Sequence, residues 1–128
     1  MTKPKLDLFI GSCVLESEEL ALSIAERLTK DLKPFEDRIT LTYKGSFDKA
    51  NRTSINSYRG PGIDEGMRIL KKVKDTFGLP VLTDFHETSQ AMKLATVVDV
   101  LQVPAFLCRQ TDMIAAGAEA CAKYGRIL

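Results

Sequence analysis

The sequence predicts an α/β fold in which strands and helices alternate along the chain and the strands form one parallel sheet. Three observations lead to this prediction. Short apolar runs typical of buried strands recur between longer segments with helical periodicity. Gly and Pro residues separate these segments, as they commonly do at the ends of helices and strands. The loops that follow strands are polar and unusual in composition, whereas those that follow helices are short and plain.

The first strand–helix unit is predicted at the start of the chain. A strand is expected over Leu6–Ile10 (LDLFI), and Gly11 and Ser12 end it. A helix then starts at Ser17 and ends at Pro34. Its apolar face is formed by residues spaced four apart, namely Leu20, Ile24, Leu28 and Leu32.

The second unit contains the longest loop. Ile39–Tyr43 (ITLTY) alternates in the manner of a strand, and a polar stretch follows over residues 44–62. Ile63–Phe77 has helical periodicity, and Gly78 lies where a C-cap is expected. A third strand is then predicted over Val81–Asp84.

The last part of the chain continues the alternation. We expect a short helix over Ser89–Thr96, a strand over Val97–Val103, and a helix over Thr111–Tyr124 with Thr111 as its N-cap. Residues 126–128 (RIL) are interpreted as a fifth strand that is cut short. The whole chain therefore reads as four βα units and the beginning of a fifth.

This order predicts half of a TIM (β/α)8 barrel. A complete barrel needs about 250 residues, and the chain has 128. No Gly-rich dinucleotide fingerprint follows the first strand, which argues against a Rossmann fold. We expect residues 1–128 to form the N-terminal half of a single barrel domain, truncated near the fifth strand.

Composition limits the possible partners and the compartment. Lys and Arg total 18 against 17 acidic residues, so no overall charge points to nucleic acid or a membrane surface. No apolar run approaches the roughly 20 residues of a membrane span, and no secretory signal is present at the N-terminus. Three widely spaced cysteines do not make a disulfide framework. These features favour a cytoplasmic enzyme.

The segment after the second strand is the most informative for function. It combines the cations Lys44, Lys49 and Arg52 with hydroxyl groups, those of Ser46, Thr53 and Ser54. Lys and Arg side chains suit phosphate and carboxylate ligands, and Arg59 and Arg109 are further candidates in three dimensions. The alternative is a solvated loop whose charges have no specific role.

Cys13 and His86 allow more than one interpretation. Cys13, after the first strand, is either a small core residue, a metal ligand or a nucleophile, and the single histidine, His86, cannot complete a zinc site with it. His86 follows Asp84 by two residues, so both side chains are expected to face the same way. It is either a neutral histidine held by its neighbours or a catalytic group. We interpret Cys108 and Cys121 as packing residues.

Four segments resemble the 3-deoxy-D-manno-octulosonate 8-phosphate synthase family, also called 2-dehydro-3-deoxyphosphooctonate aldolases. They are FIGSCVLESEEL, YKGSFDKANRTSINSYRGPGIDEG, LTDFHE and LQVPAFLCRQTD, in the family's order, and they match its N-terminal half. The related 3-deoxy-D-arabino-heptulosonate 7-phosphate synthases typically have proline where this chain has Asn51. The resemblance therefore implies a five-carbon sugar phosphate as acceptor.

The resemblance implies a transferase that condenses phosphoenolpyruvate with D-arabinose 5-phosphate in lipopolysaccharide precursor synthesis. It implies that Lys44 and Lys49 hold phosphoenolpyruvate, and that Gln102 and the backbone of Ala105 line its pocket. Ser46 is included among the substrate-binding residues.

Further roles follow from the same resemblance. Asn51, Arg52 and Thr53 are expected to meet arabinose 5-phosphate, the last two at its phosphate. Asp84 lies near the reacting groups, and the expected catalytic residues are Lys49, Asn51 and Asp84. Arg109 is expected to reach the phosphate site of a neighbouring subunit in a homotetramer.

The metal-dependent class of this family has Cys at the position of Cys13, which implies one ligand of Zn²⁺, Fe²⁺ or Mn²⁺. The family's other ligands come from later strands. We therefore expect the 128-residue chain to lack synthase activity by itself and, because a half-barrel leaves sheet edges unpaired, to self-associate. The alternatives are a heptulosonate synthase relative and a non-catalytic half-barrel that binds phosphate.

Overall fold

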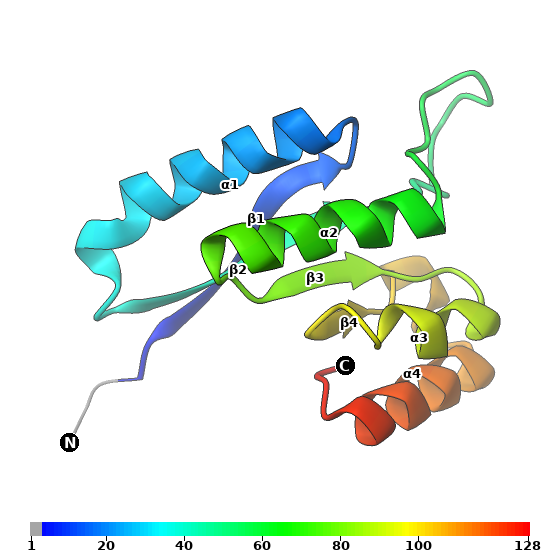
Figure 1. Cartoon of the computed structure of the whole chain (residues 1–128). Helices are drawn as coiled ribbons and strands as arrows, with labels where there is room; N and C mark the ends of the chain where they lie inside the picture. Colours follow the sequence, from blue (N-terminus) through cyan, green and yellow to red (C-terminus); the bar gives the residue numbers. More distant parts are fainter. Residues whose placement is uncertain (1–3) are drawn as a thin grey trace.

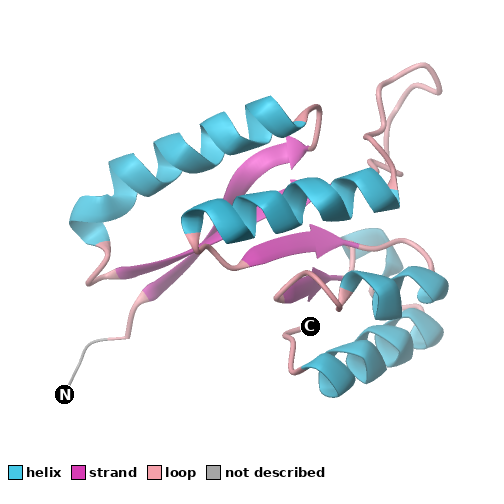
Figure 2. Cartoon of the chain, viewed as in Figure 1, coloured by secondary structure: helices cyan, strands magenta, loops and turns pink. Residues whose placement is uncertain are grey.

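A computed structural model describes residues 4–128 as one four-stranded parallel sheet with helices between the strands. The strands are β1 (Leu6–Val14), β2 (Ile39–Ser46), β3 (Val81–Asp84) and β4 (Val100–Gln102), side by side in that order. The helices are α1 (Glu18–Leu32), α2 (Ile63–Phe77), α3 (Thr88–Leu94) and α4 (Thr111–Tyr124), with two short 3-10 turns, η1 (Lys33–Phe35) and η2 (Ala105–Leu107). Figures 1 and 2 show this alternation. The predicted α/β class is confirmed, and the arrangement is that of the first half of a (β/α)8 barrel.

The helices cover one face of the sheet and leave the other face open. Figure 1 shows α1 and α2 lying over the same side of the strands, and α3 packs against α4. Alternate strand residues point into the apolar core beneath the helices, among them Tyr43, Val81 and Leu101. The intervening residues lie on the opposite face, where Lys44, Leu82 and Val100 line an open hollow. In a closed barrel this second face is the interior.

The first helix differs in detail from the prediction. Ser17, where the helix was predicted to start, is its N-cap, and its hydroxyl accepts a hydrogen bond from the Leu20 backbone N–H at 3.1 Å. The fully buried positions, however, are Ala21 and Ala25, and Leu20 is 39% exposed. The small alanines let the helix lie close to the sheet, so the buried stripe is displaced by one residue from the predicted leucine face.

The second helix agrees with its predicted bounds. It spans Ile63–Phe77, and Gly78 closes it in the left-handed conformation with φ 66°. The Gly78 N–H donates to the Lys74 carbonyl at 2.9 Å. A C-cap glycine is favoured here because side chains disfavour positive φ.

Three strand bounds and one cap differ from expectation. β1 extends to Val14 and β2 to Ser46, so Lys44 and Ser46 belong to a strand and not to a loop. Of the strand predicted over Val97–Val103, only Val100–Gln102 forms a strand, which is β4. Val97 and Val98 instead donate backbone hydrogen bonds to Leu94 in a turn after α3. The N-cap of α4 is Gln110, with no side-chain cap hydrogen bond, so Thr111 was wrongly predicted as the cap.

The predicted fifth strand is present as a single pairing. The Leu101 N–H donates to the Ile127 carbonyl at 2.8 Å, and the Ile127 N–H donates to the Asp99 carbonyl at 3.0 Å. This places residue 127 parallel to β4, as the next strand of a barrel requires. None of the helices in the described part of the chain has the length and apolarity to cross a membrane.

Candidate functional site at the carboxyl ends of the strands

The strand register brings four predicted site residues to the open face of the sheet. Lys44 on β2 pairs with Leu82 on β3, so Ser46 lies level with Asp84, each two residues further along. Asp84 in turn pairs with Gln102 on β4. Because side chains alternate between faces, Lys44, Ser46, Asp84 and Gln102 share one face. This group lies at the carboxyl ends of the strands, where barrel enzymes place their chemistry.

Asp84 is the centre of this group. The Ser46 hydroxyl donates to one carboxylate oxygen, Oδ1, and His86 Nε2 lies 3.1 Å from the other, Oδ2. The Asp84 side chain is only 13% exposed. Burial raises the pKa of Asp84, but the hydrogen bonds of His86 and Ser46 and the charge of Lys49 outweigh burial, so the pKa falls below its usual range. The carboxylate is therefore ionised at neutral pH.

The sequence-based expectation that His86 and Asp84 face the same way is confirmed by this contact. The carboxylate stands between the hydroxyl and the imidazole, and Ser46 donates to Asp84 rather than to His86. A nucleophilic serine needs the imidazole as its direct base. The arrangement is therefore a carboxylate held by two donors and not a hydrolase triad.

The loop after β2 is closed at its base. The Lys49 N–H donates to the Arg59 carbonyl at 2.5 Å, and the Gly62 N–H donates to the Phe47 carbonyl at 3.1 Å. The Asp48 carboxylate accepts two hydrogen bonds from the Arg59 guanidinium, at 2.8 and 2.7 Å. Arg59 is thus paired within the loop, whereas the half-buried Lys49 is fixed at its backbone beside the site.

The tip of this loop carries the residues expected at the sugar phosphate. Asn51, Arg52 and Thr53 are exposed, and Arg52 Nε donates to the Tyr58 carbonyl at 3.2 Å. The Tyr58 hydroxyl donates to the Leu15 carbonyl at 3.3 Å, which ties the loop to the end of β1. Lys49 and Arg52 therefore lie at the same end of the sheet, although no direct contact joins them.

Three further predicted site residues, Cys13, Ala105 and Arg109, belong to the end of β1 or to the segment that follows β4. Cys13 is exposed at the end of β1, with a left-handed φ of 60°, so its reading as a core residue is wrong. Ala105 begins η2 and Arg109 precedes α4, and both are exposed.

The two cysteines interpreted as packing residues differ in burial. Cys121 is buried, as predicted for packing, and burial raises the pKa of its thiol. Cys108 is exposed, which contradicts the packing interpretation.

A metal ion would need more ligands than these residues supply. Within residues 4–128, no three His, Cys, Asp or Glu side chains come close enough together to hold one. His86 is engaged with Asp84, and Cys13 is solvent-exposed. The described residues therefore do not form a complete metal site, and Cys13 is at most one of its ligands.

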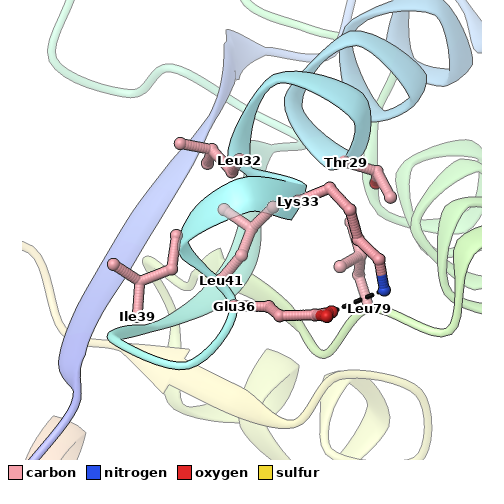
Figure 3. A pocket seen from close by; sticks show the side chains of 7 residues that line it. All are labelled: Thr29, Leu32, Lys33, Glu36, Ile39, Leu41 and Leu79. Atoms are coloured by element: carbon pink, nitrogen blue, oxygen red, sulfur yellow. Dashed lines mark hydrogen bonds and ion pairs between the residues drawn. The ribbon is translucent and has the colours of Figure 1, made fainter.

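A second hollow lies at the opposite end of the sheet, near the start of β2. It has a volume of about 220 Å³ and is lined mainly by apolar side chains (Figure 3). Its two charged residues, Lys33 and Glu36, pair with each other at 2.5 Å. Since no unpaired polar group points into it, this hollow is not a candidate for catalysis.

The half-buried cations distinguish the two ends of the sheet. Lys74 and Arg126, near the amino ends of the strands, both pair with Asp99. Lys44 and Lys49, also half-buried, have no carboxylate within 4.0 Å in the described part of the chain. Burial of a cation favours a charged partner, so these two lysines are suited to anionic ligands. The fold and site define a parallel α/β protein with two half-buried lysines, free of ion pairs in the described part of the chain, at the carboxyl ends of its strands.

Comparison with known proteins identifies the family. Residues 2–122 match the DAHP synthetase I family, and the chain belongs to it. It is 54% identical over 121 residues to a 2-dehydro-3-deoxyphosphooctonate aldolase of Campylobacter jejuni (serotype O:6), covering 93% of this chain and 43% of that protein. Proteins of the same name from Koribacter versatilis and Synechococcus sp. are 53% and 56% identical, covering 91% and 88% of this chain and 41% and 39% of those proteins. The predicted resemblance is confirmed, and the chain spans less than half the length of these relatives.

Sequence reasoning did not anticipate two parts of the site. One is the close fixation of Asp84 by His86, for which the spacing of two in an extended segment was the available signal. The other is the Asp48–Arg59 pair, which engages Nε and Nη2 of Arg59 within the loop. These residues are 11 apart and carry no periodic signal.

Proposed function

We propose that this chain supplies substrate-binding residues of a 2-dehydro-3-deoxyphosphooctonate aldolase, a transferase that is also called 3-deoxy-8-phosphooctulonate synthase. The observation that carries the proposal is the pair of half-buried lysines, Lys44 and Lys49, which have no ion pair within residues 4–128 and lie at the same end of the sheet as the ionised Asp84. The names of relatives at 53 to 56% identity support the choice of reaction.

The proposed reaction joins two anions. C3 of phosphoenolpyruvate attacks the aldehyde carbon of D-arabinose 5-phosphate, water adds at C2, and inorganic phosphate leaves. The product is 3-deoxy-D-manno-octulosonate 8-phosphate, a lipopolysaccharide precursor. Fixed cations favour this step because they bring the two anions together and offset their charge.

Each substrate has a proposed set of contacts. Lys44 and Lys49 bind the phosphate and carboxylate of phosphoenolpyruvate, while Gln102 and the backbone of Ala105 line its pocket. Ser46 supports this pocket through its hydrogen bond to Asp84. The exposed loop tip binds arabinose 5-phosphate through three residues, Asn51, Arg52 and Thr53.

Asp84 is proposed to act on the reacting groups as an acceptor. Its pKa, lowered by its two donors and by Lys49 in spite of burial, keeps it ionised. An ionised carboxylate holds and orients a hydroxyl group or a water molecule by accepting its hydrogen bond. Lys49 and Asn51 are the other residues proposed to contact the reacting atoms.

The metal and the assembly are proposed only for a protein with the full length of these relatives. Cys13 would supply one thiolate to a divalent ion (Zn²⁺, Fe²⁺ or Mn²⁺), which polarises an oxygen of a substrate or water when bound. Arg109 would reach the phosphate site of a neighbouring subunit in a homotetramer. A cytoplasmic location agrees with the three free cysteines.

Phosphoenolpyruvate titration of the 128-residue chain, followed by ¹⁵N NMR, tests the binding half of the proposal. Shifts should concentrate at Lys44, Lys49 and Gln102. Lys44→Met and Lys49→Met should each weaken binding about tenfold, the effect of losing one charge-assisted hydrogen bond. Lys33→Met, at the opposite end of the sheet, is the matched control and should leave binding unchanged. Equal weakening by all three variants, or shifts spread over the whole surface, would refute the site.

The two alternative functions predict different experimental results. A heptulosonate synthase relative would prefer a four-carbon acceptor, and the names of the relatives and Asn51 argue against it. A non-catalytic phosphate-binding half-barrel would show the same titration and no turnover even when the rest of a barrel is supplied. Phosphate release by the longer protein from both substrates separates these cases.

A further inference from the structure

His86 is a buried imidazole with one nitrogen bonded and the other without a partner. Its side chain is 9% exposed, and Nε2 lies 3.1 Å from Asp84 Oδ2. Nδ1 is fully enclosed, and it is the buried side-chain polar atom that lacks a hydrogen-bond partner in the described residues. A buried polar atom without a partner is uncommon and calls for a physical reason.

The protonation state of the ring follows from these two environments. With the proton on Nδ1, a buried N–H would lack an acceptor, and the lone pair of Nε2 would face the carboxylate oxygen of Asp84. With both nitrogens protonated, the Asp84 contact is favourable but the Nδ1 N–H is again unpaired. With the proton on Nε2 alone, the ring donates to Asp84 and only a lone pair remains unmatched. Because an unpaired acceptor is tolerated better than an unpaired donor, the third state is favoured.

The surroundings of His86 hold the ring in this orientation. The His86 backbone N–H donates to Gln90 Oε1 at 2.8 Å, and Glu87 and Gln90 form a capping box at the start of α3. The ring of Phe47, which follows β2, lies 5.7 Å from the imidazole at an interplanar angle of 57°. Phe47 is itself buried against Gly66, where a side chain would collide with its Cβ atom. The backbone of His86 is thus fixed by α3, and its ring lies beside Phe47.

We propose that His86 is a positioning residue, kept as the neutral Nε2–H tautomer, whose single N–H orients the Asp84 carboxylate toward the bound substrates. The last step rests on the proposed function, whereas the tautomer and its effect on Asp84 do not. Ser46 from β2 and His86 from the segment after β3 each hold one oxygen of the carboxylate. The plane of the acceptor is therefore set before a ligand arrives, which is the condition for preorganised electrostatics.

The chain has a single histidine, so its ring can be observed without assignment ambiguity. We expect ¹⁵N NMR of the histidine-labelled 128-residue chain at neutral pH to show a protonated Nε2 and an unprotonated Nδ1. Two variants then test the effect on Asp84. His86→Gln places an amide N–H near the Nε2 position, whereas His86→Asn places its amide near Nδ1 and leaves Asp84 Oδ2 without this donor.

The readout is the titration of the Asp84 side-chain carbon in the three chains. His86→Asn should raise the pKa of Asp84, and His86→Gln should restore it toward the wild-type value. A proton on Nδ1, a doubly protonated ring at neutral pH, or equal pKa values in the three chains would overturn the proposal. If His86→Asn fails to fold, the tautomer observed in the wild-type chain still tests the proposal. None of these measurements uses substrate, so their failure is separate from a failure of phosphoenolpyruvate to bind.

Discussion

Asp99 offers a test of how the amino ends of the strands are stabilised. Its Oδ2 accepts a hydrogen bond from the Val81 backbone N–H at 3.0 Å. Its Oδ1 lies 2.7 Å from Lys74 Nζ and 3.2 Å from Arg126 Nη1. One carboxylate therefore joins the end of α2, the start of β3 and the last residues of the chain. Replacing Asp99 should weaken the attachment of all three segments to one another and lower the free energy of unfolding.

The size of the effect follows from the burial of each partner. Val81 is fully buried, so Asp99→Ala leaves its N–H without an acceptor, which costs about 1–3 kcal/mol. The ionic partners are 24 to 32% exposed, and screening limits each pair to at most about 1 kcal/mol. The expected loss in the free energy of unfolding is about 2–4 kcal/mol for Asp99→Ala. Asp99→Asn keeps an oxygen for Val81 and should lose only about 1 kcal/mol.

Urea unfolding at low protein concentration, followed by circular dichroism, measures both values. Asp31→Ala is the matched control, because Asp31 pairs with Arg27 on the exposed surface of α1 and should change stability by less than about 0.5 kcal/mol. High salt should reduce the effect of Asp99→Asn and leave the gap between the two Asp99 variants intact. If Asn and Ala destabilise equally, the acceptor role toward Val81 is refuted.

Four further predictions concern acid, activity, assembly and metal. The pKa of Asp84 is lower in the folded chain than in the unfolded chain. The ionised Asp84 therefore stabilises the fold above its unfolded pKa, and this stabilisation is lost as the pH falls through its folded pKa. Asp84→Asn should thus make the free energy of unfolding less dependent on pH in the acid range. The 128-residue chain should release no phosphate from phosphoenolpyruvate and arabinose 5-phosphate, and turnover at an ordinary enzymatic rate would refute this. Light scattering should find a self-associated species, because exposed Phe9, Ile127 and Leu128 border unpaired sheet edges, and a clean monomer would count against it. Cobalt(II) should give no tetrahedral thiolate spectrum with this chain, because Cys13 belongs to no group of three or more potential ligands within residues 4–128.

The accuracy of the fold prediction depended on how local each signal was. The helix Ile63–Phe77 was predicted with its bounds, because its periodicity and C-cap glycine are contained in consecutive residues. The end of β2 was placed too early, since Lys44 and Ser46 are polar but still alternate with the buried Tyr43 and Gly45. The strand near Val97 was predicted too long because β-branched residues occur there, while the backbone turns back to Leu94.

The candidate site was predictable where strand periodicity alone decides it. Lys44 and Ser46 are two residues apart, so their common face follows from strand alternation once β2 is extended beyond Tyr43, where the predicted strand ended. The alignment of Ser46 with Asp84 across the sheet depends on the register between two strands that are far apart in the chain. The donor role of His86 depends further on packing against Phe47, and no pattern in consecutive residues encodes such a contact.

We expect the two ends of the sheet to have different roles, one in the stability of the fold and the other in ligand binding. At the amino ends, half-buried cations are satisfied by Asp99, so removing charge there should change unfolding and spare ligand binding. At the carboxyl ends, Lys44 and Lys49 remain half-buried without an ion pair among the described residues, an arrangement that costs desolvation energy in the free chain. A bound anion would recover that cost, so phosphoenolpyruvate should raise the stability of the wild-type chain and have little effect on the Lys44→Met/Lys49→Met double variant. Thermal unfolding with and without phosphoenolpyruvate measures this difference, and an equal rise in both chains would show that the anion binds elsewhere.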